Sequence, residues 1–358
     1  TAYKLTEGAL RENCNRLIEK AGRQNSLELY KQAVELGRTY LEAFPEDEYA
    51  YMIRWNVALI LDTKLSRYKD ALQEYLTISM VYNSNKYTTF ARKKGLSTIK
   101  EACQNAIVMG DSLVAREKRG KELVRADRAA AEPSKLTPAE SWLAMAYDNY
   151  IELFPFDQEN TPYILSNAGA MYYIHDQFEE ALKYFKTLVE YFPDSPQIEI
   201  TQLSILESYF GKKDFKSAEL LAKRIINSDS SPELKKKVEQ KLGEAIFMGA
   251  EEFAKKGASK EAAREYYRMA VETPSVKFAD RALFNSARQF EELGDYTSAI
   301  QKYEQLRNSY TGSELLPDAL NNLALDYTEI GEFEKAGERY KQLHDVSTNP
   351  GNKKDALY

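Results

Sequence analysis

The sequence predicts an all-α solenoid of about eight to nine stacked helix–turn–helix hairpins. Three observations lead to this fold class: a repeat of 37 residues anchored on alanine, helical periodicity within each repeat, and prolines placed between helices. Because a single hairpin cannot bury its apolar face alone, such repeats are expected to stack and share a continuous core.

The N-terminal part of the chain is expected to form hairpins with irregular spacing. The segment LGRTYLEAFP ends at Pro45, as LAMAYDNYIELFP ends at Pro155, and a proline after an amphipathic run marks a helix end. Residues 49–62 and 68–82 predict one hairpin joined by the turn TKLSR. Residues 86–131 are interpreted as a further, irregular hairpin.

The most regular repeats lie between residues 161 and 345. In four of them an alanine precedes an aromatic residue by four positions: Ala181–Phe185, Ala262–Tyr266, Ala299–Tyr303 and Ala336–Tyr340. The interval between successive anchors is 37 residues, except for 44 between Ala218 and Ala262, and seven extra residues are close to two helical turns. Before each turn, apolar or small residues recur at i, i+3, i+4 and i+7, which indicates one face of a helix.

Proline placement supports this scheme independently. All eleven prolines fall at predicted junctions, whereas a proline inside a helix would cost about 3 kcal/mol. The sequence TPAE at Thr137–Glu140 predicts a capping box with proline at the first helical position, and SPEL at Ser231–Leu234 predicts a similar helix start.

A charged segment suggests how the array is divided. Residues Arg116–Arg128, REKRGKELVRADR, are interpreted as a hairpin tip or linker, and the alternative is a basic patch for an acidic partner or lipid headgroups. We predict irregular hairpins over residues 1–131 and a regular array over residues 132–358. The final KDALY predicts one more, truncated repeat that continues past Tyr358.

The repeat resembles the tetratricopeptide repeat over residues 161–345. The resemblance rests on a small residue at the eighth position, an aromatic at the eleventh, alanine at the twentieth and a closing proline, as in Ala287, Phe290, Ala299 and Pro274. It implies a right-handed superhelix with a concave groove. The 37-residue period departs from the usual 34 and is similar to that of longer repeats in bacterial cell-envelope proteins, which favours the periplasm or envelope of a Gram-negative bacterium.

Composition and charge exclude several functional classes. The formal net charge of −6 argues against a nucleic-acid-binding protein, which normally has a basic surplus. No apolar run approaches the roughly 18 residues needed to span a bilayer. Cys14 and Cys103 lie far apart in helical contexts, so buried thiols are expected.

No catalytic, cofactor-binding or metal site is predicted. His175 and His344 have no second histidine or cysteine at metal-ligand spacing, and both are interpreted as surface residues. Acidic pairs such as Glu179 and Glu180 point about 100° apart on a helix, so they are interpreted as solvated side chains rather than an acid–base pair.

Candidate binding residues follow from the family resemblance, which implies that certain first-helix positions face the groove. Aromatic and arginine side chains there are typical anchors of a bound peptide. The selected partner-binding residues are Tyr163, Tyr173, Phe210, Arg281, Phe284 and Arg288. The charges with which chaperone-docking relatives hold a C-terminal carboxylate are missing, because Ser166, Ala170, Ser204, Glu244 and Met248 occupy those positions.

The sequence therefore predicts a non-catalytic scaffold that binds a protein or peptide in a multiprotein assembly of the cell envelope, without a cofactor. Two alternatives stay open. The array could recruit substrates for a catalytic domain outside residues 1–358, or it could form homo-oligomers through the ends of the solenoid.

Overall fold

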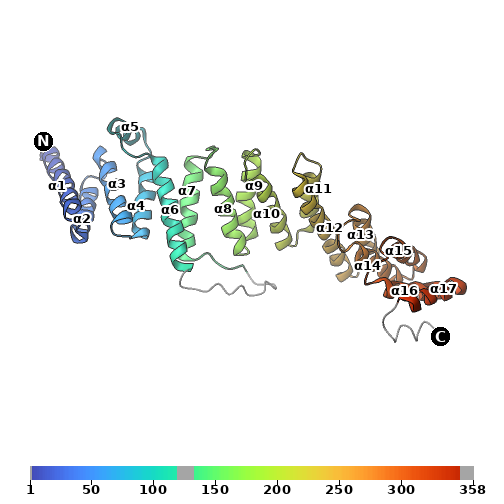
Figure 1. The fold of residues 1–358 in the computed structure, drawn as a ribbon. Coiled ribbons are helices and arrows are strands. Elements are labelled where there is room, and N and C mark those ends of the chain that lie inside the picture. The colour runs from blue at the N-terminus through green and yellow to red at the C-terminus, as the bar shows by residue number, and fades with distance from the viewer. Residues whose placement is uncertain (1, 119–132, 347–358) are drawn as a thin grey trace. The chain divides into compact units, whose positions relative to one another are not determined.

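The computed structural model describes residues 2–118 and 133–346, and these residues form helices joined by turns and loops, with no β-strand among them (Figure 1). The predicted all-α class is confirmed. The helices are α1 (Ala2–Gln24), α2 (Leu27–Ala43), α3 (Glu48–Thr63), α4 (Tyr68–Val81), α5 (Asn85–Lys94), α6 (Ile99–Lys118), α7 (Pro138–Leu153), α8 (Thr161–Ile174), α9 (Phe178–Tyr191), α10 (Ile198–Gly211), α11 (Phe215–Ile226), α12 (Pro232–Lys255), α13 (Ser259–Glu272), α14 (Ala279–Glu292), α15 (Tyr296–Ser309), α16 (Leu316–Glu329) and α17 (Phe333–Val346).

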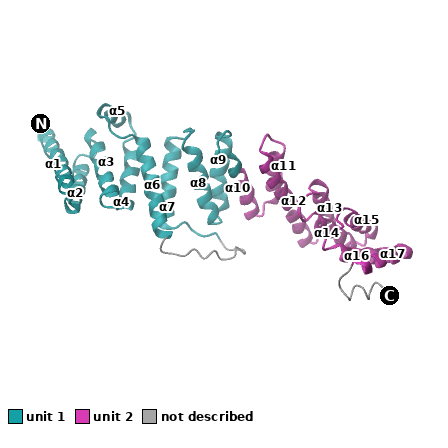
Figure 2. Cartoon of the chain, in the orientation of Figure 1, with its two compact units in different colours: residues 1–201 teal, residues 202–358 magenta. Residues whose placement is uncertain are grey.

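All the described helices except α5 pair into eight hairpins, in agreement with the predicted eight to nine. The pairs are α1–α2, α3–α4, α6–α7, α8–α9, α10–α11, α12–α13, α14–α15 and α16–α17. The chain divides into two compact units, residues 1–201 and 202–358, with the boundary inside α10 (Figure 2). Inside each unit, the second helix of one hairpin packs against the first helix of the next, as α4 does on α6 and α13 does on α14.

In every hairpin except α6–α7, most of whose connection lies outside the described residues, the turn contains one residue in the left-handed region, where glycine is favoured. In the C-terminal hairpins this residue is Gly257, Gly294 or Gly331, with φ of +72° to +79°. Elsewhere the residue is Asn25, Ser66, Asp176 or Lys213. The same turn geometry therefore recurs where the glycine pattern is absent, which explains why the earlier hairpins were harder to recognise from sequence.

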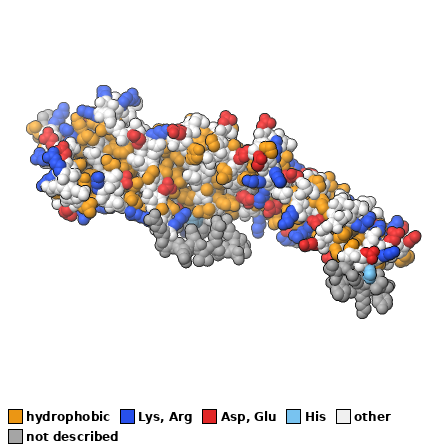
Figure 3. All heavy atoms as spheres, viewed as in Figure 1, with side chains coloured by type: hydrophobic (Ala, Val, Ile, Leu, Met, Phe, Trp, Pro, Cys, Tyr) orange, Lys and Arg blue, Asp and Glu red, His pale blue; other side chains and the backbone are white. Residues whose placement is uncertain are grey.

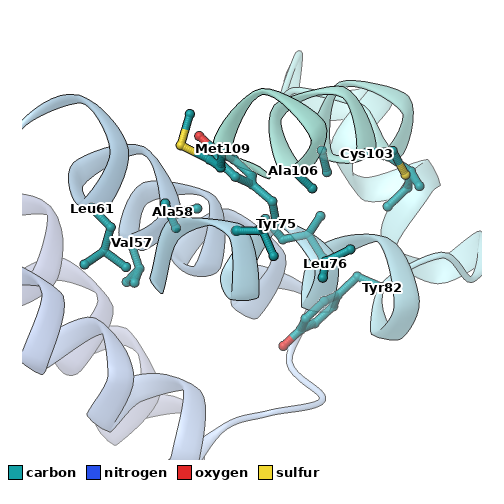
Figure 4. Packing of buried hydrophobic residues seen from close by; sticks show 14 of the residues in the cluster. Val57, Ala58, Leu61, Tyr75, Leu76, Tyr82, Cys103, Ala106 and Met109 are labelled. Carbon is teal, nitrogen blue, oxygen red and sulfur yellow. The ribbon is translucent and has the colours of Figure 1, made fainter. Parts of the chain in front are cut away.

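The alanine anchors occupy equivalent buried positions, as the stacking scheme requires. Ala181, Ala262 and Ala299 are fully buried, and Ala336 is 4% exposed. Figure 4 shows the corresponding core of the N-terminal unit, where Val57 and Leu61 of α3, Tyr75 of α4 and Met109 of α6 pack together. Each hairpin thus supplies part of its neighbour's core, and burial of this apolar surface stabilises the stack.

Prolines and caps lie where the sequence predicts them. Pro138 and Pro232 are the first residues of α7 and α12, and Pro155 and Pro274 directly follow the C-cap residues of the second helices α7 and α13. Thr137 and Glu140 form the predicted capping box. Cys14 and Cys103 are buried, free thiols, also as predicted.

The region after residue 85 differs from its prediction. The described part of residues 86–131, up to Lys118, does not form a hairpin of its own, because α5 is a short additional helix and α6 packs against α4 and α7. Most of the charged segment Arg116–Arg128 and the predicted boundary at residue 131 lie outside the described residues, as does the repeat predicted from KDALY. The division at residue 131 therefore stays a prediction.

His175 is not the plain surface residue that the sequence predicts. Its Nε2 donates to Glu140 Oε2 at 2.8 Å, and its Nδ1 lies 2.8 Å from Ser134 Oγ. Gln177 Nε2 also donates to the Ser134 carbonyl oxygen at 2.6 Å. Because Glu140 belongs to the capping box of α7, His175 ties the start of α7 to the turn between α8 and α9. A sequence pattern could not reveal this contact, since the partners lie 35 and 41 residues away.

We expect His175→Ala to lower the free energy of unfolding by about 1–3 kcal/mol, because it leaves the buried Glu140 carboxylate without one of its donors. His344→Ala is the matched control, since His344 is 40% exposed and should change stability by less than about 0.5 kcal/mol. Urea unfolding of both variants at pH 7 measures the difference. Equal stability of the two variants would contradict a structural role for His175.

Candidate functional site

The candidate site is the surface formed by the first helices of the hairpins, here called the first-helix face. In residues 1–201 this face is formed by α3, α6 and α8, and in residues 202–358 it is formed by α12, α14 and α16. The second helices pack against these first helices, and tyrosine side chains of the second helices contact them.

A tyrosine from a second helix meets an asparagine from the next first helix at four places. The clearest pair is Tyr303 of α15 and Asn322 of α16, in which Asn322 Nδ2 donates to Tyr303 Oη at 2.9 Å. Tyr303 Oη in turn donates to Glu291 Oε1 of α14 at 2.8 Å. The tyrosine therefore fixes the orientation of the asparagine amide, whose second N–H and carbonyl oxygen are not used in this bond.

At the other three places the asparagine lies beside the tyrosine: Tyr75 with Asn105, Tyr147 with Asn167, and Tyr266 with Asn285. Among these four pairs, only Tyr303 and Asn322 are joined by a hydrogen bond, and the buried hydroxyl of Tyr75 has no hydrogen-bond partner among the described residues. Burial raises the pKa of Tyr266 to about 12 and also raises the pKa of Tyr147, whereas the neighbouring asparagine acts in the opposite direction in both.

Each tyrosine also lies near a carboxylate of a preceding first helix: Asp62, Asp111, Glu251 or Glu291. Burial is the largest effect on Asp62, Asp111 and Glu291, and it raises the pKa of all three. Asp111 is exposed to solvent, yet enough protein surrounds it to produce this shift. In the described part of the chain, neither Asp62 nor Asp111 has an ion-pair partner, so a cation placed beside them would be stabilised.

The six residues selected from the sequence are divided between the two units. In residues 1–201, Tyr163 is 49% exposed on α8, and Tyr173 on the same helix is half-buried, with its ring 5.6 Å from that of Phe178. In residues 202–358, Phe210 of α10 is half-buried, with its ring 5.9 Å from Phe215 and the Lys241 ammonium 4.9 Å from its centroid. Phe210 is thus held between neighbours.

The remaining three predicted residues share one helix. Arg281, Phe284 and Arg288 all belong to α14. Phe284 packs edge-on to the Tyr303 ring at 5.5 Å, and Arg288 pairs with Glu291 at 3.2 Å, so both lie beside the Tyr303–Asn322 pair. Arg281 and Arg288 are exposed. Their role in binding stays a prediction.

The sequence contains a signal for the tyrosine–asparagine pairs, but this signal spans two repeats. Asn285 and Asn322 each follow their tyrosine by 19 residues, and Asn167 follows Tyr147 by 20. The contact joins one repeat to the next, so a comparison of positions within one repeat does not show it.

The described residues lack other marks of a chemical or membrane site. Across residues 2–118 and 133–346, no three or more histidine, cysteine or acidic side chains are grouped so as to hold a metal ion. In the same ranges, no helix combines the length and apolar character needed to cross a bilayer.

Comparison with known proteins identifies the repeat. Residues 167–195 and 281–313 match the family model of the tetratricopeptide repeat. These segments contain α9 and α15 together with parts of α8 and α14. No curated protein matches the sequence.

Among solved structures, similarity was found to YrrB, described as a TPR protein with an unusual peptide-binding site, at 16% identity over 60% of this chain and 98% of that one, with a TM-score of 0.32. The TPR domain of P58(IPK) is 12% identical over 96% of both chains, with a TM-score of 0.32. Yeast Tom70 is 14% identical over 99% of this chain and 94% of that one, with a TM-score of 0.28. Similarity at this level carries no argument about function.

Proposed function

Because this chain belongs to the tetratricopeptide-repeat superfamily, we propose that it is a non-catalytic scaffold that binds segments of partner proteins along its first-helix faces. The observation that supports this proposal is the bond that holds Asn322 on Tyr303, together with an asparagine beside a tyrosine at three further places. A side chain that is already fixed loses little conformational entropy on binding.

An asparagine amide is suited to the backbone of an extended peptide, because it offers a donor and an acceptor to a peptide group that has one of each. Asn285 and Asn322 lie on the successive first helices α14 and α16, so an extended partner would meet one amide after the other along this face. In residues 1–201, Asp62 and Asp111 would favour lysine or arginine side chains in that segment.

The cell-envelope assembly inferred from the 37-residue period forms part of this proposal. Identification of the bound partner distinguishes three possibilities: a periplasmic location, recruitment of substrates for a catalytic domain outside this chain, and self-association. A second copy of this chain as the captured protein would favour self-association.

We expect the triple variant Asn167→Ala, Asn285→Ala, Asn322→Ala to bind its partner at least about tenfold more weakly, since each amide loses contacts of about 0.5–1.5 kcal/mol. Affinity capture from the source cells, quantified by mass spectrometry, identifies the partner, and titration of that partner gives the dissociation constant. Asn308→Ala is the control, because Asn308 is exposed on the second helix α15. Unchanged binding by the triple variant would contradict the proposal.

The variant Phe284→Ala with Arg288→Ala, measured in the same way, tests the residues selected from the sequence. We expect weaker binding, because both side chains lie beside the Tyr303–Asn322 pair. If this variant binds normally while the asparagine variant does not, these two residues do not belong to the binding site.

A further inference from the structure

The C-terminal unit shows how the chain itself neutralises a carboxylate on the first-helix face. Glu291 of α14 accepts a hydrogen bond from Tyr303 and pairs with Arg288 Nε at 3.2 Å. Arg288 precedes Glu291 by three residues, so the two side chains lie on the same side of α14. Phe284 precedes Glu291 by seven residues and packs edge-on to the Tyr303 ring at 5.5 Å. An aromatic ring, a cation and a carboxylate therefore follow one another along this helix.

The same order of residues recurs on α3, but without the cation. Trp55 packs edge-on to the Tyr75 ring at 5.4 Å, and Asp62, seven residues after Trp55, lies beside the Tyr75 hydroxyl. The position that Arg288 occupies on α14, three residues before the carboxylate, is taken on α3 by Leu59, which is 50% exposed. Burial raises the pKa of Asp62 and the nearby Tyr75 hydroxyl acts in the opposite direction, whereas no cation among the described residues contributes.

A buried hydroxyl beside Asp62 is also without a partner. Tyr75 is fully buried, and its hydroxyl makes no hydrogen bond with the described residues. The equivalent hydroxyl of Tyr303 is bonded to both Glu291 and Asn322. Because a buried polar group without a partner is unfavourable, a donor that reaches this part of the face would be stabilised.

The next first helix repeats the arrangement of α3. Asp111 of α6 interacts with Tyr147 of α7, and burial raises the pKa of Asp111 without a contribution from any cation among the described residues. Val108 stands three residues before Asp111 and is 53% exposed. Two successive first helices thus expose an apolar side chain one turn before an unpaired carboxylate: Leu59 before Asp62, and Val108 before Asp111.

The basic residues of these helices are engaged elsewhere or lie farther away. Their contacts are Arg54 with Glu74, Lys100 with Asp157 at 2.9 Å, and Arg116 over the Tyr68 ring at 3.9 Å. Lys118 lies two helical turns, or about 10 Å, beyond Asp111 along α6, and α8 has no charged residue. On the side of the molecule drawn in Figure 3, Lys and Arg gather over α1 and α5, whereas hydrophobic and uncharged side chains predominate over α8 and α9. The two carboxylates are therefore open to a cation from another molecule.

We propose, building on the proposed function, that each of these two positions binds a lysine or arginine side chain of the partner segment. The methylene groups of that side chain pack on Leu59 or Val108, and its charged end pairs with Asp62 or Asp111. The partner thereby supplies the cation that Arg288 supplies on α14. Both the apolar stem and the charge are needed, because each position presents an exposed apolar group and a carboxylate one turn apart.

A synthetic peptide tests this proposal. The probe carries fluorescein and consists of six lysine–alanine units, so that all lysines point to one side of an extended chain. Its binding is followed by fluorescence anisotropy and should weaken as salt rises. Acetylated lysine keeps the stem and removes the charge, whereas diaminobutyrate in place of lysine keeps the charge and shortens the stem by two methylenes. Each of these two peptides should bind at least fivefold more weakly.

Two double variants test the protein side of the contact. Asp62→Asn with Asp111→Asn removes the carboxylates and should weaken binding of the lysine peptide at least fivefold. Leu59→Arg with Val108→Arg places a cation of the chain where α14 already has one, and should weaken binding at least tenfold. Thermal unfolding followed by circular dichroism verifies that both variants fold.

The control is Glu42→Gln with Glu152→Gln, which makes the same change in net charge at exposed positions of the second helices α2 and α7 and should alter binding less than twofold. A loss in the control equal to that of the carboxylate variant would show a nonspecific attraction to an acidic chain. Arginine variants that fold and bind the peptide normally, or a diaminobutyrate peptide that binds as tightly as the lysine peptide, would overturn the proposal. Displacement of the peptide by an equal concentration of 1,5-diaminopentane would assign the positions to a small amine instead.

Failure here is distinguishable from failure of the proposed function. If capture of the partner depends on the asparagines of the triple variant but not on Asp62 and Asp111, the partner does not place basic side chains at these positions, and the proposed function stands without them. If the asparagine variant captures its partner normally while the carboxylate variant loses the lysine peptide, the proposed function fails instead.

Discussion

Phe185→Ala should lower the free energy of unfolding by about 3–5 kcal/mol, the usual cost of removing a fully buried aromatic side chain. Phe185 is 1% exposed on α9 and faces Gly169 of α8. A Cβ at Gly169 would lie only 2.4 Å from Phe185 Cε1, so only glycine at this position leaves room for the ring. The alanine variant leaves a cavity at the point where the two helices approach each other.

The pair also predicts a specific coupling. Gly169→Ala alone should destabilise the protein by about 1–3 kcal/mol through overpacking against the ring. In the Phe185→Ala background the same change should cost little, because the new methyl group enters the cavity. The two effects should therefore fail to add, as expected for residues in contact.

Urea unfolding gives the stabilities, and amide hydrogen exchange in α8 and α9 locates the loss, because a repeat depends mainly on its neighbours. Phe156→Ala is the control, since Phe156 is 68% exposed in the same unit and should change stability much less. Equal losses at Phe185 and Phe156, or additive effects of the Gly169 and Phe185 changes, would contradict this account of the packing.

The sequence could predict those parts of the fold that depend on contacts within one hairpin. Ala299 and Tyr303 lie one helical turn apart and both are buried, so their spacing in the sequence indicates the buried face of α15. Proline positions likewise indicate helix ends, because the effect of proline is local. These features recur at a fixed interval, and this recurrence allows them to be recognised in the sequence.

The parts that the sequence did not predict depend on contacts between hairpins. His175 reaches Ser134 and Glu140, and Tyr303 holds Asn322, each from a different hairpin or connection. In the sequence these residues cannot be distinguished from other polar or small residues of a helix, because only the stacking of the hairpins brings them to their partners.

A buried carboxylate in the last described hairpin is expected to make the stability of the protein depend on pH. Asp326 of α16 is 3% exposed, and its Oδ2 has no hydrogen-bond partner among the described residues. Burial raises its pKa from 3.8 to about 7, with smaller contributions from Glu291 of α14 and Glu329 of its own helix. Tyr303 of α15 is the other titratable group that interacts with it.

The direction of the pH effect follows from proton binding. Between pH 3.8 and about 7 the folded protein holds a proton on Asp326 that the unfolded chain has released, so stability falls as pH rises. The contribution is complete below pH 3.8 and is lost by about pH 7. A shift of this size corresponds to at most about 4 kcal/mol, at about 1.4 kcal/mol per pH unit.

Asp326→Asn should therefore stabilise the protein by up to about 4 kcal/mol at pH 8 and by little at pH 4, because the amide keeps the shape of the acid without its charge. Urea unfolding of the wild type and the variant at pH 4, 6 and 8 measures the difference, with hydrogen exchange in α16 to locate it. Asp318→Asn is the control on the same helix: Asp318 is exposed in the first turn, where the helix dipole favours its charge, so its replacement should cost up to about 1 kcal/mol at pH 8. A difference between wild type and Asp326→Asn that stays constant from pH 4 to pH 8 would mean that the Asp326 carboxylate ionises in the folded protein as easily as in the unfolded chain.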